Sequence, residues 1–422
     1  MGPGARSAAS ALLAGALVFV AACSDDEDPA GEQTGTTVAA ETTETTTSTT
    51  SEADAGAAEV DEGTDLYGLA EQFEPGEPGD VIAYQPVSDA GVDGSVYRVL
   101  YHSESIQGDD IAVSGVIAVP DGVAPAGGRP VLSWAHGTTG LGDTCAPSLD
   151  PAGALAGLAP PFLERGMVFV ATDYEGLGTP GLHPYIAGES EGRSTLDIIR
   201  AARNLEELTG AGDQVVLWGH SQGGHAVLFA NQLAPTWAPE LDVVGTVAGA
   251  PPSQLPLISA ALRNSGAAYY LAMAAAGWNA AYPEADLDLV MTPAAQDLLP
   301  VMEEGCAGDI AEAYAALSYD EMTVADPATV EQWATLLVTN DPGRVLGESP
   351  ILIIHGEADN TIPVVSSQLL LDRMCGLGQV VERRTYPGAG HADVVQPSFD
   401  DMVTWIEDRL AGEPAPTSCP SP

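Results

Sequence analysis

Short, continuous apolar runs alternate with helix-like segments along most of the chain. Such runs, with helices between them, are typical of parallel sheets that are covered on both faces. The pattern therefore predicts an α/β fold with a mostly parallel sheet flanked by helices, in one large domain over residues 66–422. The predicted strands are 111–119, 131–135, 168–172, 215–218, 243–248, 351–355 and 380–386.

One stretch, about residues 252–345, interrupts this alternation. It is rich in Ala, Leu and Met, is helix-like throughout and contains no clear strand. Because it lies between two predicted strands, we expect it to form an inserted helical cap. Its large side chains either line a substrate site or form the cap's own core. They are Tyr269, Tyr270, Met273, Trp278 and Met291.

The first 22 residues have the pattern of a signal peptide. Arg6 is their only positive charge, and the apolar run 11–22 is too short to span a membrane comfortably. The run ends in Val-Ala-Ala-Cys-Ser, which is similar to a bacterial lipobox. Cleavage there would leave Cys23 as the first residue, carrying lipid. The alternative is ordinary signal cleavage next to an incidental cysteine.

Residues 23–65 are rich in Thr, Glu, Asp, Ala and Gly, with hardly an aliphatic side chain to bury. Such a segment cannot offset the entropy of ordering its backbone. We therefore expect a disordered, acidic, Thr-rich tether between the membrane and the α/β domain.

The net charge of the chain excludes some classes of binding partner. Its formal net charge is −47, and all 13 basic residues are arginine. This charge argues against nucleic acid or an anionic membrane surface as a partner. It reflects either a saline habitat or a bias in base composition. No Cys-x-x-Cys pair or histidine cluster indicates a metal site, and we expect no cofactor.

A Gly-x-Ser-x-Gly pattern at residues 219–223 is the strongest indication of chemistry. The apolar run 214–218 precedes it, and the helix-like run 225–233 follows. Strand, Gly-rich turn and helix are the context of a nucleophile elbow, which exposes the serine Oγ above the sheet. Ser221 is therefore our candidate nucleophile. The alternative is a Gly-rich turn whose serine only caps the helix.

A nucleophilic serine needs a histidine base, which in an α/β-hydrolase follows it in the chain. Three histidines follow Ser221. His225 lies on the same helix and points away from the serine, and His355 ends a predicted strand. His391 lies in a Gly-rich loop after the last predicted strand, where the base belongs. The alternative for His391 is an exposed loop histidine.

The acid that orients the base should follow the preceding strand. Asp359 lies just past that strand, in a turn closed by Pro363. Its rivals are Glu357, closer to the strand, and Asp393, which is near His391 in sequence. We predict Asp359 as the acid. Capping the turn is its alternative role.

Acyl transfer also needs two donors for the oxyanion. One is the backbone N–H after the nucleophile, that of Gln222. The other usually comes from the loop after the third strand, and here the run 131–135 leads into His-Gly-Thr-Thr. We expect Thr138 or Thr139 to supply this N–H, helped by its hydroxyl. The alternative is an ordinary turn between strand and helix.

With these residues in place, the chain resembles the Candida-type secretory lipase family of α/β-hydrolases. The resemblance covers about residues 65–420 and includes the serine elbow and the loops of Asp359 and His391. Two segments depart from it. The oxyanion loop lacks the acidic residue that fungal members often carry, and the elbow has His-Ser-Gln instead of Tyr-Ser-Gly. The other matching blocks are Cys-Ala-Pro-Ser at 145–148, Asp-Tyr-Glu-Gly at 173–176, Ile-Ala-Gly-Glu-Ser-Glu-Gly at 186–192, Leu-Asp-Ile-Ile-Arg-Ala at 196–201, Trp-Ala-Pro-Glu-Leu at 237–241 and Val-Val-Gly at 243–245.

The resemblance implies lipase or esterase action on carboxylic esters through Ser221, Asp359 and His391, under a helical lid. With the lipobox-like segment, it indicates a bacterial lipoprotein, exported and anchored at the cell surface, with an ester or lipid as substrate. One alternative is a serine peptidase of the same fold. Another is a non-catalytic surface lipoprotein that uses the fold for binding, although no triad member is missing.

The cysteines agree with export. Besides Cys23, four remain, an even set that by count alone allows three pairings. The resemblance favours Cys145 with Cys306, joining the oxyanion side to the lid. It also favours Cys375 with Cys419, holding the C-terminal tail to the last helical region.

Overall fold

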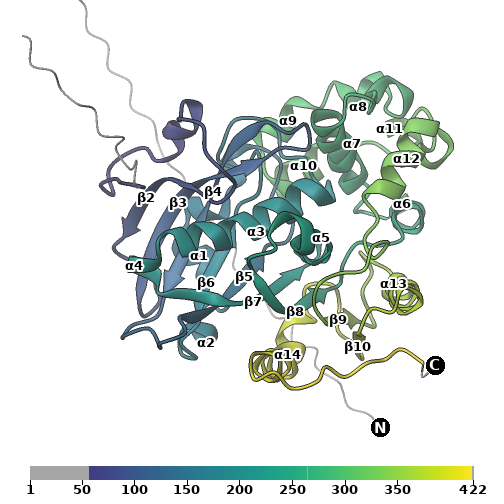
Figure 1. The fold of residues 1–422 in the computed structure, drawn as a ribbon. Helices are drawn as coiled ribbons and strands as arrows, with labels where there is room; N and C mark the ends of the chain where they lie inside the picture. Colours follow the sequence, from purple (N-terminus) through teal and green to yellow (C-terminus); the bar gives the residue numbers. More distant parts are fainter. Residues whose placement is uncertain (1–56, 264, 421–422) are drawn as a thin grey trace, which may run out of the picture. The chain divides into compact units, whose positions relative to one another are not determined.

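The computed structural model describes residues 57–263 and 265–420 (Figure 1). The predicted signal peptide and Cys23 lie outside these residues, as does most of the predicted tether. Ten strands of the described part form one sheet in the order β1-β2-β3-β4-β6-β5-β7-β8-β9-β10. They are β1 (Ala58–Glu59), β2 (Val81–Val87), β3 (Ser95–Glu104), β4 (Asp110–Val119), β5 (Arg129–Ala135), β6 (Val168–Thr172), β7 (Ala211–His220), β8 (Asp242–Gly249), β9 (Ile351–Gly356) and β10 (Val381–Tyr386).

The sheet is mostly parallel. Strands β6, β5, β7, β8, β9 and β10 pair in parallel, whereas β2, β3 and β4 form an antiparallel group joined to β6. The α/β-hydrolase prediction of a mostly parallel sheet is therefore confirmed. Because the carboxyl ends of parallel strands meet at one edge, the loops after β5, β7, β9 and β10 can converge there.

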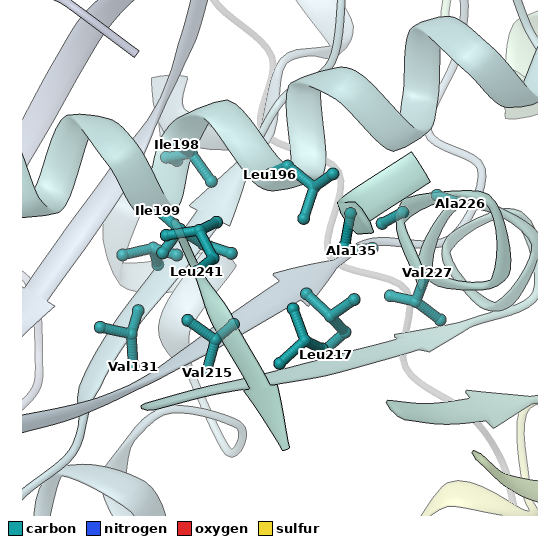
Figure 2. Packing of buried hydrophobic residues seen from close by; sticks show 14 of the residues in the cluster. Val131, Ala135, Leu196, Ile198, Ile199, Val215, Leu217, Ala226, Val227 and Leu241 are labelled. Atoms are coloured by element: carbon teal, nitrogen blue, oxygen red, sulfur yellow. The ribbon is translucent and has the colours of Figure 1, made fainter. Parts of the chain in front are cut away.

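Helices cover both faces of this sheet (Figure 1). Alternate residues of β7 point to opposite faces, so the strand is apolar on both. Val215 and Leu217 pack in one cluster with side chains of α3 and α5 (Figure 2). Val216 and Trp218 pack in a second cluster with side chains of α2 and α14. These helices are α2 (Pro160–Leu163), α3 (Gly188–Asn204), α5 (Gln222–Trp237) and α14 (Val395–Leu410).

Among the described residues between β8 and β9, the region predicted as a cap, there are seven α-helices. They have an apolar core of their own, which includes Trp278, Tyr314 and Trp333. The cap helices are α6 (Leu255–Leu262), α7 (Tyr269–Ala281), α8 (Pro293–Gln296), α9 (Pro300–Glu304), α10 (Ala307–Tyr314), α11 (Tyr319–Met322) and α12 (Glu331–Thr339). The remaining α-helices are α1 (Pro151–Leu155), α4 (Glu206–Thr209) and α13 (Val364–Leu377).

The boundary of the predicted tether at residue 65 needs correction. Glu59 of β1 pairs with Tyr84 of β2. The backbone carbonyls of Asp61 and Thr64 accept hydrogen bonds of 2.8 and 3.0 Å from the side-chain amide of Gln85. Gln85 is buried, and a buried amide requires acceptors. Residues 58–64 are therefore part of the folded domain, although they contain few aliphatic side chains.

Both disulfides that the family resemblance implied are present. Cys145 is bonded to Cys306, which precedes α10, and so links the loop after β5 to the cap. Cys375 of α13 is bonded to Cys419 in the C-terminal tail. Across the described residues, no helix is long and apolar enough to cross a membrane.

Candidate active site

Ser221 stands at the sharp turn between β7 and α5. Its backbone has φ 58° and ψ −121°, a strained conformation for a residue with a side chain. The Ser221 N–H donates a 2.8 Å hydrogen bond to the carbonyl of Gly249 in β8, which holds the turn. A Cβ at Gly223 would lie 1.8 Å from the carbonyl oxygen of Ala135, so only glycine allows this close packing. The predicted elbow geometry is therefore present.

Three predicted site residues form one hydrogen-bonded chain. His391 Nε2 lies 2.9 Å from Ser221 Oγ, and His391 Nδ1 lies 2.7 Å from Asp359 Oδ2. The two loops that carry His391 and Asp359 are joined by a 2.9 Å bond from the Ala358 N–H to the Ala389 carbonyl. The three side chains come from the ends of β7, β9 and β10, as parallel strands predict.

Asp359 is held as a carboxylate inside its turn. Its side chain is fully buried, and its Oδ1 accepts hydrogen bonds from the N–H groups of Thr361 and Ile362 at 2.9 and 2.8 Å. Burial alone would raise the pKa of Asp359. Hydrogen bonds from His355 and His391 outweigh that effect and hold this pKa well below its usual range.

The rival candidates lie elsewhere. The side chain of Glu357 accepts a 2.9 Å hydrogen bond from the hydroxyl of Thr385, and Asp393 is exposed. His225 is buried in α5 and bonds to Glu191, so it does not reach the nucleophile.

The predicted oxyanion residues flank the nucleophile. Gln222 opens α5, where the first N–H groups have no partner within the helix and the helix dipole favours negative charge. On the other side, a Cβ added at Gly137 would lie 3.7 Å from Ser221 Cβ. The hydroxyl of the next residue, Thr138, is 2.8 Å from that of Tyr185. Thr139 turns its carbonyl toward the cap, where it accepts the Ala307 N–H at 2.8 Å.

A cavity opens at Ser221 and is lined mainly by apolar cap side chains. Of the five large cap side chains singled out from the sequence, Tyr270, Trp278 and Met291 line it. Met273 and Tyr269 instead pack within the cap's own core. Further lining residues are Tyr185, Leu255, Met322, Trp333 and Leu337.

A buried polar network beneath the elbow was not predicted. The carboxylate of Glu191, on α3, accepts a 2.9 Å hydrogen bond from the side-chain amide of Gln222. Its other oxygen lies 2.7 Å from His225 Nδ1, while His225 Nε2 lies 2.8 Å from the carbonyl of Asn340. Both ring nitrogens of His225 thus lie within hydrogen-bond distance of an oxygen, one from Glu191 and one from the Asn340 backbone. The block 186–192 was noted in the family resemblance, but no role was assigned to Glu191.

His220, next to the nucleophile, is expected to make the folded protein sensitive to acid. Burial, together with nearby His391, lowers the pKa of His220 to about 4 from 6.5. Below pH 6.5, His220 therefore binds a proton in the unfolded chain but not in the folded protein. This difference lowers the free energy of unfolding as the pH falls toward 4. The variant His220→Gln lacks this effect. When the pH is lowered from about 7.5 to about 5, the unfolding free energy of the variant minus that of wild type should increase by about 1–2 kcal/mol. Urea denaturation of both proteins at both pH values measures this difference, and a difference that does not change with pH contradicts the lowered pKa of His220.

The chain of Ser221, His391 and Asp359 has the geometry in which a serine can attack an acyl carbon. A histidine placed between a hydroxyl and a buried carboxylate can take the hydroxyl proton and later return it to a leaving group. Within residues 57–263 and 265–420, no three His, Cys, Asp or Glu side chains gather as a possible metal site.

Comparison with known proteins agrees with this chemistry. A family model described as secretory lipase matches residues 155–418, more than half of the chain. Lipase A of Arthroderma benhamiae is 27% identical over 384 residues, covering 82% of this chain and 79% of that protein. The secreted triacylglycerol lipase LIP4 of Malassezia globosa is 27% identical over 299 residues, covering 66% and 65%.

Among solved structures, Candida antarctica lipase A has a similar fold. Its TM-score is 0.69 at 22% identity, and the match covers 82% of this chain and 85% of that one. This likeness concerns the fold, whereas the match to the family model covers the region of the elbow, the acid and the base. The chain therefore belongs to the secretory lipase family and is a carboxylic ester hydrolase.

Proposed function

We propose that this protein is an exported, lipid-anchored lipase that hydrolyses esters of medium and long acyl chains through Ser221, His391 and Asp359. The observation that carries the proposal is the unbroken hydrogen-bonded chain from Asp359 through His391 to Ser221, at the mouth of an apolar cavity. An acyl chain could lie in that cavity while its carbonyl carbon meets Ser221 Oγ.

The reaction proceeds in two halves. His391 Nε2 takes the proton of Ser221 Oγ as the oxygen attacks the ester carbonyl, and a tetrahedral intermediate forms. His391 then protonates the leaving alkoxide, which leaves an acyl group on Ser221. Water, deprotonated by the same His391 Nε2, attacks this acyl-enzyme and releases the acid. Asp359 holds the His391 tautomer and stabilises the imidazolium in both halves.

The backbone N–H groups of Gln222 and Thr138 hold the oxyanion in this scheme. The N-terminus of α5 supplies the first, and the loop after β5 supplies the second. The hydroxyl of Tyr185, a residue that lines the cavity, lies 2.8 Å from that of Thr138 and fixes the Thr138 side chain. Thr139 is the second choice, since its carbonyl is engaged with the cap. Losing one oxyanion donor typically costs about 10²–10³ in rate.

The lining of the cavity favours a long acyl chain, because most of the side chains around it are apolar. Each methylene buried against such a wall contributes about 0.8 kcal/mol. Acetate would leave most of the cavity unused, so binding energy should grow with the acyl chain until the cavity is filled.

Several observations support export and anchoring. The Malassezia globosa relative is named a secreted triacylglycerol lipase, and the family is described as secretory. Two disulfides join distant parts of the fold, which suits an oxidising compartment. We assign residues 1–22 to a signal peptide and Cys23 to lipid attachment. The acidic segment after it, up to about residue 57, would act as the tether. The membrane contact would then come from the acyl chains on Cys23.

The test is hydrolysis of p-nitrophenyl acetate, butyrate, octanoate and palmitate, with the matching p-nitroanilides for peptidase chemistry. We expect kcat/KM to rise about 10-fold or more from acetate to octanoate, and the amides to be hydrolysed far more slowly. A preference for acetate would make the protein a short-chain esterase. Amide hydrolysis as fast as ester hydrolysis would favour a peptidase. Folded protein that binds the esters without hydrolysing them would favour a binding lipoprotein.

A further inference from the structure

A second histidine contacts the acid of the candidate triad. His355 lies at the end of β9, and its side chain is fully buried. Its Nε2 is 3.0 Å from the carbonyl oxygen of Ile362 and 3.2 Å from Asp359 Oδ2. Among the described residues, its Nδ1 is buried without a hydrogen-bond partner. The mechanism above does not use this side chain.

These contacts determine the protonation state of His355. Both acceptors, the Ile362 carbonyl and the Asp359 carboxylate, face Nε2, so the ring proton belongs there. A proton on Nδ1 as well would be a buried, unpaired donor on a charged ring, which is far more costly than an unpaired acceptor on a neutral one. His355 is therefore a neutral imidazole whose Nε2–H is shared between Ile362 and Asp359.

Asp359 accepts three hydrogen bonds, and His355 makes a fourth polar contact with it. The N–H groups of Thr361 and Ile362 bind Oδ1, His391 binds Oδ2, and His355 Nε2 lies 3.2 Å from Oδ2. A carboxylate has about four such acceptor positions, so all are occupied. The hydrogen bond from His355 opposes the effect of burial on the pKa of Asp359 and helps to keep the group ionised.

We propose that His355 is a positioning residue that sets, through Asp359, the pH at which His391 loses its proton and becomes a base. The proposal rests on the proposed function. By sharing the negative charge of Asp359 Oδ2, His355 weakens the hold of that oxygen on the proton at His391 Nδ1. The result is an imidazole that is neutral, and so able to act as a base, at a lower pH.

Other titratable groups face this pair but do not replace His355. His220, from β7, donates its Nε2–H to the backbone carbonyl of His391 at 2.9 Å, and the two rings are 5.0 Å apart. Asp393, on the loop of His391, is exposed, and so is Glu357 in the acid turn. None of these three donates a hydrogen bond to Asp359. If the Nε2–H of His355 is removed, His220, Asp393 and Glu357 should therefore not compensate for it, and the change in the pH profile should be measurable.

The test compares His355→Leu, which removes the donor, with His355→Gln, whose amide nitrogen can reach the position of Nε2. In His355→Leu, we expect the acid limb of the kcat/KM profile for p-nitrophenyl octanoate to move up by about 0.5–1 pH unit. His355→Gln should return the limb most of the way to the wild-type position. An equal loss of rate at all pH values in both variants, with the limb unmoved, would overturn the proposal and leave a packing role.

A matched control is His102→Leu. His102 is also a buried histidine bonded to an aspartate, Asp110 at 2.8 Å, but it lies in β3, outside the candidate site. This variant should lose stability without moving the limb. A shift of the same size in His102→Leu would show that the profile reports folding, and the proposal would fail.

NMR of wild-type protein labelled at histidine nitrogens gives a result that needs no variant to fold. We expect His355 to carry its proton on Nε2. A proton on Nδ1 of His355 instead would overturn the proposal. Full activity in Ser221→Ala would instead refute the proposed function, whatever the behaviour of His355.

Discussion

Ser221→Ala should lower kcat for ester hydrolysis by about 10⁵–10⁶-fold, the largest effect of any single change in this chain. Alanine removes the oxygen that lies 2.9 Å from His391 Nε2, and with it the acyl-enzyme route. His391→Ala should cost nearly as much. The double variant should be no slower than either single one, because nucleophile and base act as a unit. Steady-state kinetics with p-nitrophenyl octanoate measures all three.

Ser133→Ala is the matched control for this prediction. Ser133 is a buried serine of β5 whose hydroxyl donates to the carbonyl of Thr195 at 2.9 Å. It makes no contact with the candidate site, so its loss should affect stability and leave kcat near the wild-type value. If Ser221→Ala remains within about 10-fold of wild type, Ser221 is not the nucleophile. Thermal unfolding of each variant shows whether any loss of rate comes from loss of fold.

Local sequence patterns were sufficient to predict the central strands of the sheet and the nucleophile elbow. The seven predicted strands correspond to β4–β10. Most of them are short and largely apolar because they are buried on both faces, whereas β10 is only half-buried and carries Glu382, Arg383 and Arg384. Ser221 could be placed because strand, glycine turn and helix follow one another directly in the chain. The positions of Asp359 and His391 after later strands follow from the same parallel order, since it brings strand ends to one edge of the sheet.

The missing strands show where such patterns fail. β2 and β3 mix half-buried and buried residues, and β2 even contains a proline, Pro86, as antiparallel strands near a sheet edge can. β1 is two residues long and depends on pairing with β2. For these strands, tertiary pairing rather than local apolar content decides the conformation.

The polar contacts around the candidate site were the hardest part of the structure to predict from the sequence. Glu191 and His225 are 34 residues apart, and Glu191 meets Gln222 only when α3 and α5 pack together. From the sequence, His355 could be considered only as a candidate base. Its contacts with Ile362 and Asp359 exist only in the fold, where the turn that carries Asp359 packs against the end of β9. A histidine at the end of a buried strand, four residues before a candidate acid, is the signal that could have placed it.

Asp359→Asn is expected to lower kcat by about 10⁴-fold, a smaller loss than that expected for Ser221→Ala or His391→Ala. The N–H groups of Thr361 and Ile362 would hold the amide oxygen of the new side chain, as they hold Oδ1 now. Its NH₂ group would then face His391 Nδ1. To accept from that group, His391 must move its proton to Nε2, where it points at Ser221 Oγ and cannot take the serine proton.

Asp359→Asn also places two hydrogen-bond donors face to face, because the new NH₂ group lies next to the Nε2–H of His355. We therefore expect Asp359→Asn to lose about 1–3 kcal/mol of unfolding free energy in addition to its loss of rate. Glu357→Gln is the control, since Glu357 is in the same turn but binds Thr385 and not His391. Kinetics and urea denaturation of both variants separate the two effects. Near-normal kcat in Asp359→Asn, with a large loss in Glu357→Gln, would move the role of the acid to Glu357.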